Sequence, residues 1–178
     1  MKKRFVLMAA LVASLSVFAS CDDDDDNDNT SATIPTAKYA GKATMAVSVM
    51  GQNFEFATVD TLCIAPDSKG EFANISFAGR NVSVEQMGGM TITIGSFVVD
   101  SVVVSSANGG LKLSREGKFN TETSFAMGMA PVSSKSVSGS LSDGSTIKDG
   151  DVNVTITDIV VGEMPGSLSL VFEGEEIK

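Results

Sequence analysis

The stretch that decides the fold class covers residues 42–49 and reads KATMAVSV, in which polar or small side chains alternate with apolar ones. Successive side chains of a β-strand point to opposite faces, so an alternation with a period of two is typical of a half-buried strand. Residues 50–53, MGQN, supply a turn, and the alternation resumes with Phe54 and Phe56 on either side of Glu55. The sequence therefore predicts a β-hairpin at this position.

The same pattern continues to the C-terminus. Strand-like segments lie at 71–78, 81–85, 90–105, 111–113, 119–130, 132–141, 152–161 and 166–172. Turn residues separate them, and Asn108-Gly109 is the strongest short-range hairpin signal among these. After Val17, no window of eleven or more residues has a helical periodicity that exceeds the alternating one. The chain is therefore predicted to be all-β.

Two irregularities are predicted within the strands. The apolar phase slips at 57–60, before Leu62 and Ile64, which predicts a β-bulge or bend. Gly95 is expected to kink a long strand over 90–105. Strict alternation along that strand would put Phe97, Val99 and Val103 on one face and Val98, Val102 and Val104 on the other.

About 140 residues in eight to ten short strands suit one antiparallel domain, which is either a β-barrel or a β-sandwich. Hairpin connections throughout, with a bulge and several strand glycines, favour an up-and-down barrel. About eight strands would leave an interior that side chains fill or that holds one small ligand. A barrel spanning the outer membrane is disfavoured, because one Tyr and no Trp cannot form aromatic girdles.

The first 20 residues have the features of a secretory signal. Three basic residues, Lys2, Lys3 and Arg4, precede an apolar run over 5–18 and the small residues Ala19 and Ser20. The run is too short for a transmembrane helix, which needs about 20 apolar residues. The sequence predicts that residues 1–20 are a signal peptide and that the chain is exported.

Cys21 directly follows this segment, in the sequence VFASC. The arrangement resembles a bacterial lipobox, in which the Cys thiol receives a diacylglycerol and becomes the new N-terminus. Phe18 stands where an aliphatic residue is usual. Stable anchoring requires more than one acyl chain, and a diacylated and then N-acylated Cys meets that requirement. Cys21 is therefore the predicted lipidation site and membrane anchor.

Residues 21–36, CDDDDDNDNTSATIPT, form a polar, low-complexity tether that is predicted to be disordered. The aspartates at 22–26 directly follow Cys21, which resembles the signal that sends Bacteroidetes lipoproteins to the outer face of the outer membrane. Without the signal peptide the chain has 10 Lys and Arg against 22 Asp and Glu, a net charge of −12. Such an acidic protein is not expected to bind nucleic acid.

The domain at 37–178 resembles a known family. The segments at 39–43 (YAGKA), 50–54 (MGQNF) and 168–174 (LSLVFEG) are similar to the calycin-like β-barrel lipoproteins of gut Bacteroidetes. The likeness covers 38–174 and rests mainly on strand and turn patterns. It implies a lipocalin-like barrel and a surface location, and it brings no established activity and no functional residues.

No catalytic or cofactor-binding constellation is recognisable in the chain. It contains no His, which excludes Ser-His-Asp and Cys-His catalysis as well as His-based zinc and haem sites. Neither a P-loop nor a dinucleotide-binding fingerprint is present. The chain is therefore expected to be non-enzymatic, with no catalytic residues, no metal site and no cofactor.

Three weaker signals have a structural and a functional interpretation. Cys63 is expected to be a buried free thiol in the core. The methionines, such as Met127 and Met129, would pack in the core or an apolar pocket in preference to binding Cu(I). The Asp-Gly pairs at 143–144 and 149–150 are expected to form turns in preference to Ca²⁺ sites.

Three functions remain open at this point. The leading hypothesis is a surface-anchored, non-enzymatic barrel that binds a small apolar ligand or a surface protein. The second is a structural, adhesive or accessory interaction module of a surface complex, which would present an exposed edge strand or apolar patch. The third, least favoured, is an enzyme that uses two carboxylates.

Overall fold

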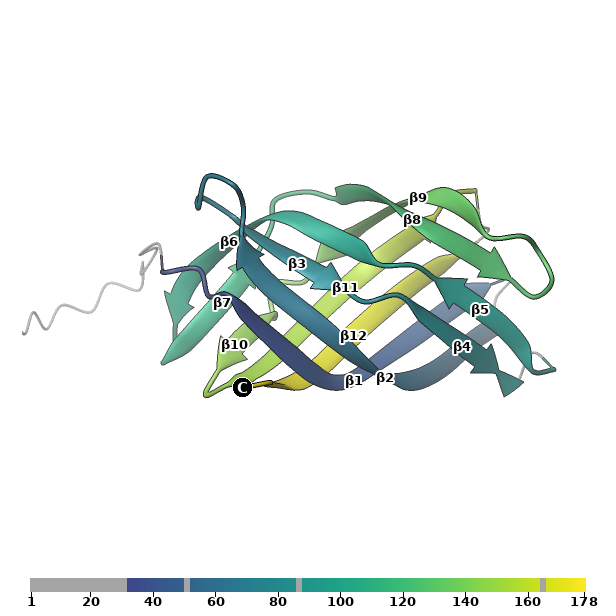
Figure 1. Ribbon diagram of the computed structural model, residues 1–178, viewed down its shortest axis with the longest axis horizontal. Coiled ribbons are helices and arrows are strands. Elements are labelled where there is room, and N and C mark those ends of the chain that lie inside the picture. The colour runs from purple at the N-terminus through teal and green to yellow at the C-terminus, as the bar shows by residue number, and fades with distance from the viewer. Residues whose placement is uncertain (1–31, 50–51, 86–87, 164–165) are drawn as a thin grey trace, which may run out of the picture.

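The computed structural model describes residues 32–49, 52–85, 88–163 and 166–178. This part of the chain forms twelve β-strands, all paired antiparallel, which Figure 1 shows wound around one axis. The strands are β1 (Ala37–Val49), β2 (Gln52–Pro66), β3 (Ala73–Phe77), β4 (Arg80–Val84), β5 (Met90–Ile94), β6 (Phe97–Ala107), β7 (Gly110–Ser114), β8 (Phe119–Met127), β9 (Ser133–Leu141), β10 (Thr146–Lys148), β11 (Asp151–Val161) and β12 (Ser167–Glu176). The prediction of an all-β antiparallel domain is confirmed.

The twelve strands are eight long ones, four of which are broken in two. β3 continues into β4, β5 into β6, β7 into β8 and β9 into β10, and in each pair the halves follow one another after a short interruption. Each long strand pairs with its neighbours in the sequence, and β12 pairs with β1. The β10–β11 ladder completes the ring. The result is a closed up-and-down barrel of eight long strands, within the predicted range of eight to ten.

Two of the predicted short turns lie within the described ranges at 108–109 and 149–150. The predicted turn at 50–53 lies partly outside those ranges. Asn108 and Gly109 have φ angles of 46° and 77°, and Asp149 and Gly150 have φ angles of 56° and 91°. Two consecutive positive φ angles match the twist of a two-residue hairpin, which explains the Asn-Gly and Asp-Gly sequences. Gly95 lies in the break between β5 and β6, as the predicted kink requires.

The bulges lie elsewhere than predicted. β2 pairs with β1 without a register shift from Gln52 to Ile64, so the bulge expected at 57–60 is absent and that prediction was wrong. The actual shifts interrupt β11 between Ile156 and Ile159, and the pairing of β3 with β6 next to Ser101. Ser101 and Asp158 have φ angles of 56° and 51°, which bulges tolerate.

The bulge at Ser101 reverses the alternation along β6. Val99 and Val102 are both fully buried, and Val104 is buried as well, whereas Val103 is 42% exposed. The predicted division of these valines between two faces was therefore wrong beyond Asp100. One extra residue in a strand moves every later side chain to the opposite face.

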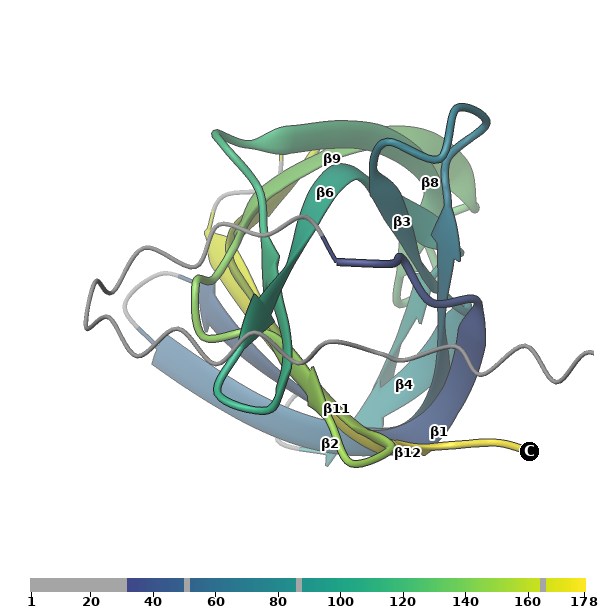
Figure 2. The same ribbon diagram turned by 90° about the vertical axis from the view of Figure 1, so that its left-hand side faces the viewer.

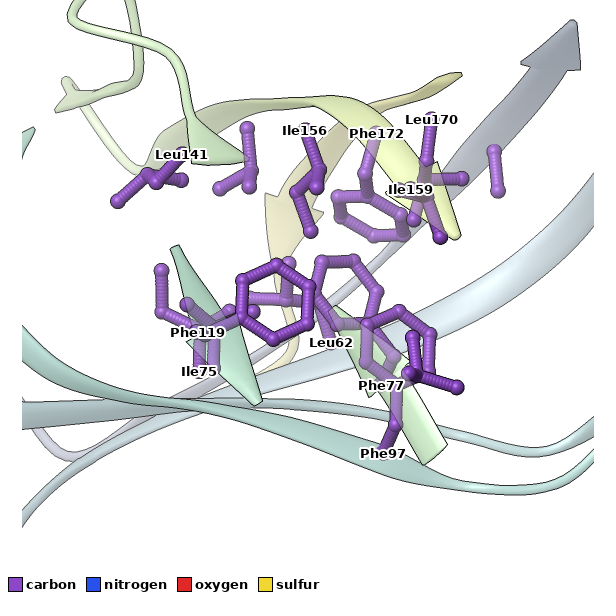
Figure 3. Packing of buried hydrophobic residues seen from close by; sticks show 14 of the residues in the cluster. Leu62, Ile75, Phe77, Phe97, Phe119, Leu141, Ile156, Ile159, Leu170 and Phe172 are labelled. Carbon is purple, nitrogen blue, oxygen red and sulfur yellow. The ribbon is translucent and has the colours of Figure 1, made fainter. Parts of the chain in front are cut away.

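Four phenylalanine rings pack together in the core of the barrel (Figure 3). Phe77 on β3 stacks on Phe97 on β6 with ring centroids 4.8 Å apart, and Phe97 stacks in turn on Phe119 of β8 at 6.3 Å. Phe172 on β12 meets Phe77 edge to face at 6.5 Å. Phe77 and Phe97 are cross-strand neighbours on the adjacent strands β3 and β6. The contact of Phe77 with Phe172 joins β3 to β12, which are not neighbours in the sheet.

The barrel has two unlike ends. Figure 2 shows the segment that leads into β1 crossing one of them, which we call the proximal end. Ala32 N donates a hydrogen bond to Val104 O at 3.3 Å, and Ile34 packs against the core. The opposite end, which we call the distal end, is formed by β4, β5, the first halves of β2, β9 and β12, and the last parts of β1, β8 and β11 (Figure 1, right).

Several predictions concern residues outside the described part of the chain. They are the signal peptide at 1–20, the lipidation site Cys21 and the tether as far as residue 31. Within the described ranges, no helix reaches the length and apolarity that a membrane span requires.

Candidate functional site

A buried ion pair lies inside the distal half of the barrel. Asp60 faces the interior because even-numbered residues of β2, such as Leu62 and Ile64, point inward. Arg80 opens β4 and faces inward with Val82 of the same strand. Arg80 Nη2 contacts Asp60 Oδ2, and the two side chains are only 5% and 3% exposed. Gly41, which has no side chain, lies opposite Asp60 on β1.

Burial dominates the electrostatics of this pair. Desolvation raises the pKa of Asp60 above its ordinary value of 3.8, although Arg80 and the hydrogen bond from Thr61 N work in the other direction. That hydrogen bond joins Thr61 N to Asp60 Oδ1 over 2.8 Å. Desolvation likewise lowers the pKa of Arg80 from its ordinary value, against the attraction of Asp60. In both groups burial has a larger effect on the pKa than the charge of the partner has. A buried ion pair is therefore weak evidence for added stability.

The guanidinium of Arg80 retains unused donors. Its Nε and Nη1 atoms are buried and have no hydrogen-bond acceptor among the described residues. Nη2 makes the ionic contact with Asp60 Oδ2. Buried polar groups normally find a partner, so an Arg with two unused nitrogens inside a barrel is exceptional.

A small cavity with a wholly apolar wall lies beside Arg80, which contributes carbon atoms to that wall. It has a volume of about 20 Å³ and lies between the sheet walls of the distal half. Arg80 is the one charged residue among the described residues that line it. The other lining residues are Met45, Ile94, Phe97, Val137, Ile159, Val161, Leu168 and Leu170.

Buried side chains near this end are slightly more accessible to solvent than those in the middle of the barrel. Ile94, Ile159 and Leu168 keep 5–6% of their surface exposed, whereas Ile75 and Phe172 in the central core have none. Nearer the distal rim, four larger apolar side chains are only partly buried against the core: Phe54, Phe56, Phe125 and Met127. We call these four partly buried apolar side chains at the distal end the mouth.

The wall of the barrel is incomplete beside the ion pair. β2 pairs with β3 from Leu62 to Pro66, and the last backbone contact runs from Ala78 N to Thr61 O at 3.2 Å. Beyond it, no ladder of the described residues joins the first half of β2 to β4. We call this gap between the edges of β2 (residues 53–60) and β4 the seam. Asp60 and Arg80 face each other across its inner side.

A second, larger hollow lies on the outer surface, outside β1 and β10 to β12. It measures about 680 Å³, and four acidic residues line it, namely Asp149, Asp151, Glu173 and Glu175. All four are exposed to solvent. No group of three or more Cys, Asp or Glu residues in the described part of the chain is arranged to hold a metal ion. An open, hydrated acidic surface lacks the water-excluded setting that carboxylate catalysis uses.

The weaker signals from the sequence have mixed outcomes. Asp149-Gly150 forms the predicted turn between β10 and β11. Cys63 was expected in the core, but it is a free thiol, partly exposed, on the outer face of β2 between the inward-facing Leu62 and Ile64. Met127 packs against the core as predicted, whereas Met129 is fully exposed, because the strand ends at Met127.

Asp60 and Arg80 were not predicted as site residues. The signal was present, because the apparent slip of apolar phase at 57–60 is an unbroken strand with a charged residue in an inward position. The sequence could not show which residue pairs with Asp60. Arg80 approaches Asp60 only because β3 pairs with β2 and leads into β4.

Comparisons with known proteins add little to this description. No family profile and no curated protein matches the chain. A crystal structure from Bacteroides fragilis, provisionally described as an outer membrane protein, is 23% identical, with a TM-score of 0.49 over 79% of this chain. The chain spans only half of that protein's length. The ywiB protein of Bacillus subtilis is 11% identical, with a TM-score of 0.34 over 82% of this chain and 96% of its own.

Proposed function

We propose that this protein is a surface-anchored, non-enzymatic lipoprotein whose calycin-like barrel binds a small apolar ligand at its distal end. The observation that carries the proposal is the apolar cavity behind a mouth of partly buried Phe and Met side chains. Mouths of β-barrels with an apolar lining and few polar groups are typical ligand sites.

The size of the cavity sets a condition on binding. About 20 Å³ is room for roughly one water molecule, whereas a cavity of about 150 Å³ is needed for a ligand as small as benzene. The ligand must therefore displace side chains or widen the seam. Met45 lines the cavity and can adopt new rotamers easily. The seam can widen without breaking a backbone ladder.

The anchor would place the mouth away from the membrane. Residues 32–36 lie at the proximal end of the barrel, so a lipid on Cys21 would tether that end. Residues 21–31 could span at most about 40 Å when fully extended. The distal mouth would then face the surroundings of the cell, with the aspartates at 22–26 supporting export to the outer face.

Native mass spectrometry of the mature protein isolated from its own cells tests ligand binding. We expect a small molecule to remain bound. Nile red, a neutral apolar dye, provides a second test with matched variants. Val161→Phe fills the cavity and should abolish dye binding, whereas Val152→Phe, at a buried site outside it, should retain binding. A clean mass together with equal dye binding by both variants would contradict the proposal.

The location is tested separately in intact cells. Cys21→Ala should release the protein from the membrane fraction. Replacing the aspartates at 22–26 by Asn should keep it in the membrane but protect it from protease added outside the cells. Unchanged protease sensitivity would show that the acidic run does not direct surface display.

The seam favours a second candidate, an accessory protein-interaction module. The facing edges of β2 and β4 offer unpaired backbone groups, and Val59 on the outer side of β2 is 84% exposed. Unpaired strand edges bind partner strands by β-augmentation. Recovery of one stoichiometric protein partner after cross-linking in cells, with no bound small molecule, would select this candidate.

A further inference from the structure

One stretch of strand edge in the barrel wall has no partner strand in the described structure. In the proximal half, the β10–β11 ladder closes the ring. The distal half has no equivalent among the described residues, because the pairing of β2 with β3 ends at Leu62 and β4 pairs only with β5. The edge of β2 over residues 53–60 therefore borders the seam with backbone groups that no described strand uses.

This edge lacks the features that usually protect an edge strand from pairing. Natural edges are blocked by Lys, Pro, a bulge or an inward-pointing charge. Residues 53–59 read NFEFATV, without Lys or Pro, and β2 pairs with β1 without a register shift. The one inward charge, Asp60, lies where the seam begins, next to the last backbone contact from Ala78 N to Thr61 O. A strand added to this edge would therefore extend along 53–59 and end before Asp60.

The side chains along the edge alternate between two environments. Phe54 and Phe56 point inward and are only partly buried. Glu55, Ala57 and Val59 point outward and are exposed, Val59 to 84%. Side chains on neighbouring strands of a sheet contact each other face by face. An added strand would cover the two phenylalanines only if its inward side chains were apolar.

The exposed charges on the two edges of the seam are acidic. Glu55 lies on β2, and Glu85 directly follows β4. Residues 53–60 contain no Lys or Arg, and the one cation of β4, Arg80, is buried. Lys42 lies one strand further away on β1, where its other neighbour is Glu173 on β12. Opposite charges on neighbouring strands attract and like charges repel, so the outward side chains of an added strand should be basic.

The same charges disfavour two occupants from the protein itself. The tether at 21–31 carries six aspartates, and it leads into residues 32–36 at the proximal end. A second copy that used its own β2 edge would bring another Glu55 to the same seam. The occupant with complementary charge is therefore a segment of a different protein.

We propose that the seam edge of β2 binds an extended segment of a partner protein in which apolar residues alternate with Lys or Arg. This inference rests on the second candidate function and names the kind of partner. The segment pairs through its backbone with residues 53–59 of β2. Its apolar side chains contact Phe54 and Phe56, and its basic side chains lie beside Glu55. The distal half of the wall thereby gains a strand in the seam.

Fluorescence anisotropy of labelled synthetic peptides with the mature protein tests both parts of the proposal. A short peptide that alternates Val and Lys should bind at least tenfold more tightly than the same peptide with Glu in place of Lys. Two further versions of the basic peptide carry N-methyl groups on alternate amides, in opposite phases. The phase that faces β2 loses its donors, so at least one version should bind at least tenfold more weakly. Hydrogen exchange locates the site, because the bound peptide should slow the amides of 53–60 and leave those of β12 unchanged.

Matched variants of the protein separate the seam from general charge attraction. Glu55→Lys should weaken binding of the basic peptide at least tenfold. Glu116→Lys makes the same change of charge at an exposed position between β7 and β8, so it is the control and should keep most of the binding. Replacing the aspartates at 22–26 by Asn should also leave binding in place. Circular dichroism confirms that each variant is folded before titration.

The outcomes separate this inference from the functions proposed above. Equal affinity for the Lys and Glu peptides, or for all the methylated and unmethylated ones, would overturn it. Equal weakening by Glu55→Lys and Glu116→Lys would do the same, as would binding that is lost with the aspartates at 22–26. The second candidate function itself fails only if cross-linking in cells recovers no protein partner. Nile red binding tests the apolar site independently of every peptide.

Discussion

At the residue scale, Asp60 and Arg80 place two opposite charges inside a largely apolar barrel interior. Their side chains are 3% and 5% exposed, and desolvation governs the pKa of both. Replacing a buried pair by apolar residues of similar volume is often neutral, whereas removing one partner is costly, because it strands the other charge. On this argument the pair contributes little net stability to the barrel.

This interpretation predicts an asymmetric mutant cycle. Arg80→Met should destabilise the protein by about 3 kcal/mol at neutral pH, since Asp60 is left buried without its counter-charge. The double variant Asp60→Leu/Arg80→Met should recover most of that loss. Urea unfolding followed by circular dichroism measures both values. A double variant as unstable as Arg80→Met would show that the charges themselves stabilise the barrel.

The raised pKa of Asp60 predicts a pH dependence opposite to that of most acids. The folded protein holds the Asp60 proton more strongly than the unfolded chain, whose carboxyl titrates near 3.8. Stability from this group is therefore greatest below 3.8 and falls as the pH rises through the folded-state pKa. The unfolding free energy of the wild type relative to Asp60→Asn should decrease over that interval. An increase would mean that Arg80 outweighs desolvation.

At the element scale, glycine allows β1 and β12 to coil tightly around each other. Gly41 lies opposite Gly174 in the ladder, and a Cβ on Gly41 would lie 2.0 Å from Glu173 O and 2.4 Å from Gly174 Cα. Both obstacles are backbone atoms, which cannot turn aside as a side chain would. On its other side, Gly41 pairs with Asp60 of β2.

Gly41→Ala should therefore destabilise the barrel by about 3 kcal/mol, the upper part of the range for overpacked sites. Gly144→Ala is the matched control, because the nearest atom to its new Cβ would be Ser142 Oγ at 3.8 Å, an ordinary contact. Its effect should stay within about 1 kcal/mol. Thermal unfolding measures both, and equal melting temperatures would show that β12 adjusts to the added methyl group.

At the scale of the whole molecule, the barrel is closed and tightly packed in its middle and incomplete at its distal end. The aromatic stack joins β3, β6, β8 and β12 across the interior. Residues 32–36 cover the proximal end, whereas the seam interrupts the wall near the distal mouth. Local opening is easiest where few backbone bonds must break, so the seam is the expected route to the interior.

Hydrogen exchange should reveal this difference between the two ends. Amides of β4 and of β2 residues 53–60 that face the seam should exchange at least tenfold faster than those of β11 and β12, which are paired on both edges. Residues 62–64 of β2, which pair with both β1 and β3, are the internal control. Equal protection of β4 and β12 would contradict an opening at the seam.

Sequence alone determined the fold class, the single domain and most hairpins. Strand alternation depends on a few neighbouring residues, so a short stretch of sequence is enough to predict it. The same is true of the two turns Asn108-Gly109 and Asp149-Gly150. The same holds for the break at Gly95. For the N-terminal export and anchoring features, the sequence is the basis of the proposals.

Tertiary structure alone decided what lies inside the barrel. The bulges next to Ser101 and Asp158 change which later residues of β6 and β11 face the interior. Cys63 faces outward because its neighbours Leu62 and Ile64 occupy the inward positions. Asp60 and Arg80 are 20 residues apart in the sequence. They meet because β2 and β4 face each other across the seam. Strands that are far apart in the sequence, such as β1 and β12, pair only when the barrel closes. No short stretch of sequence specifies that closure.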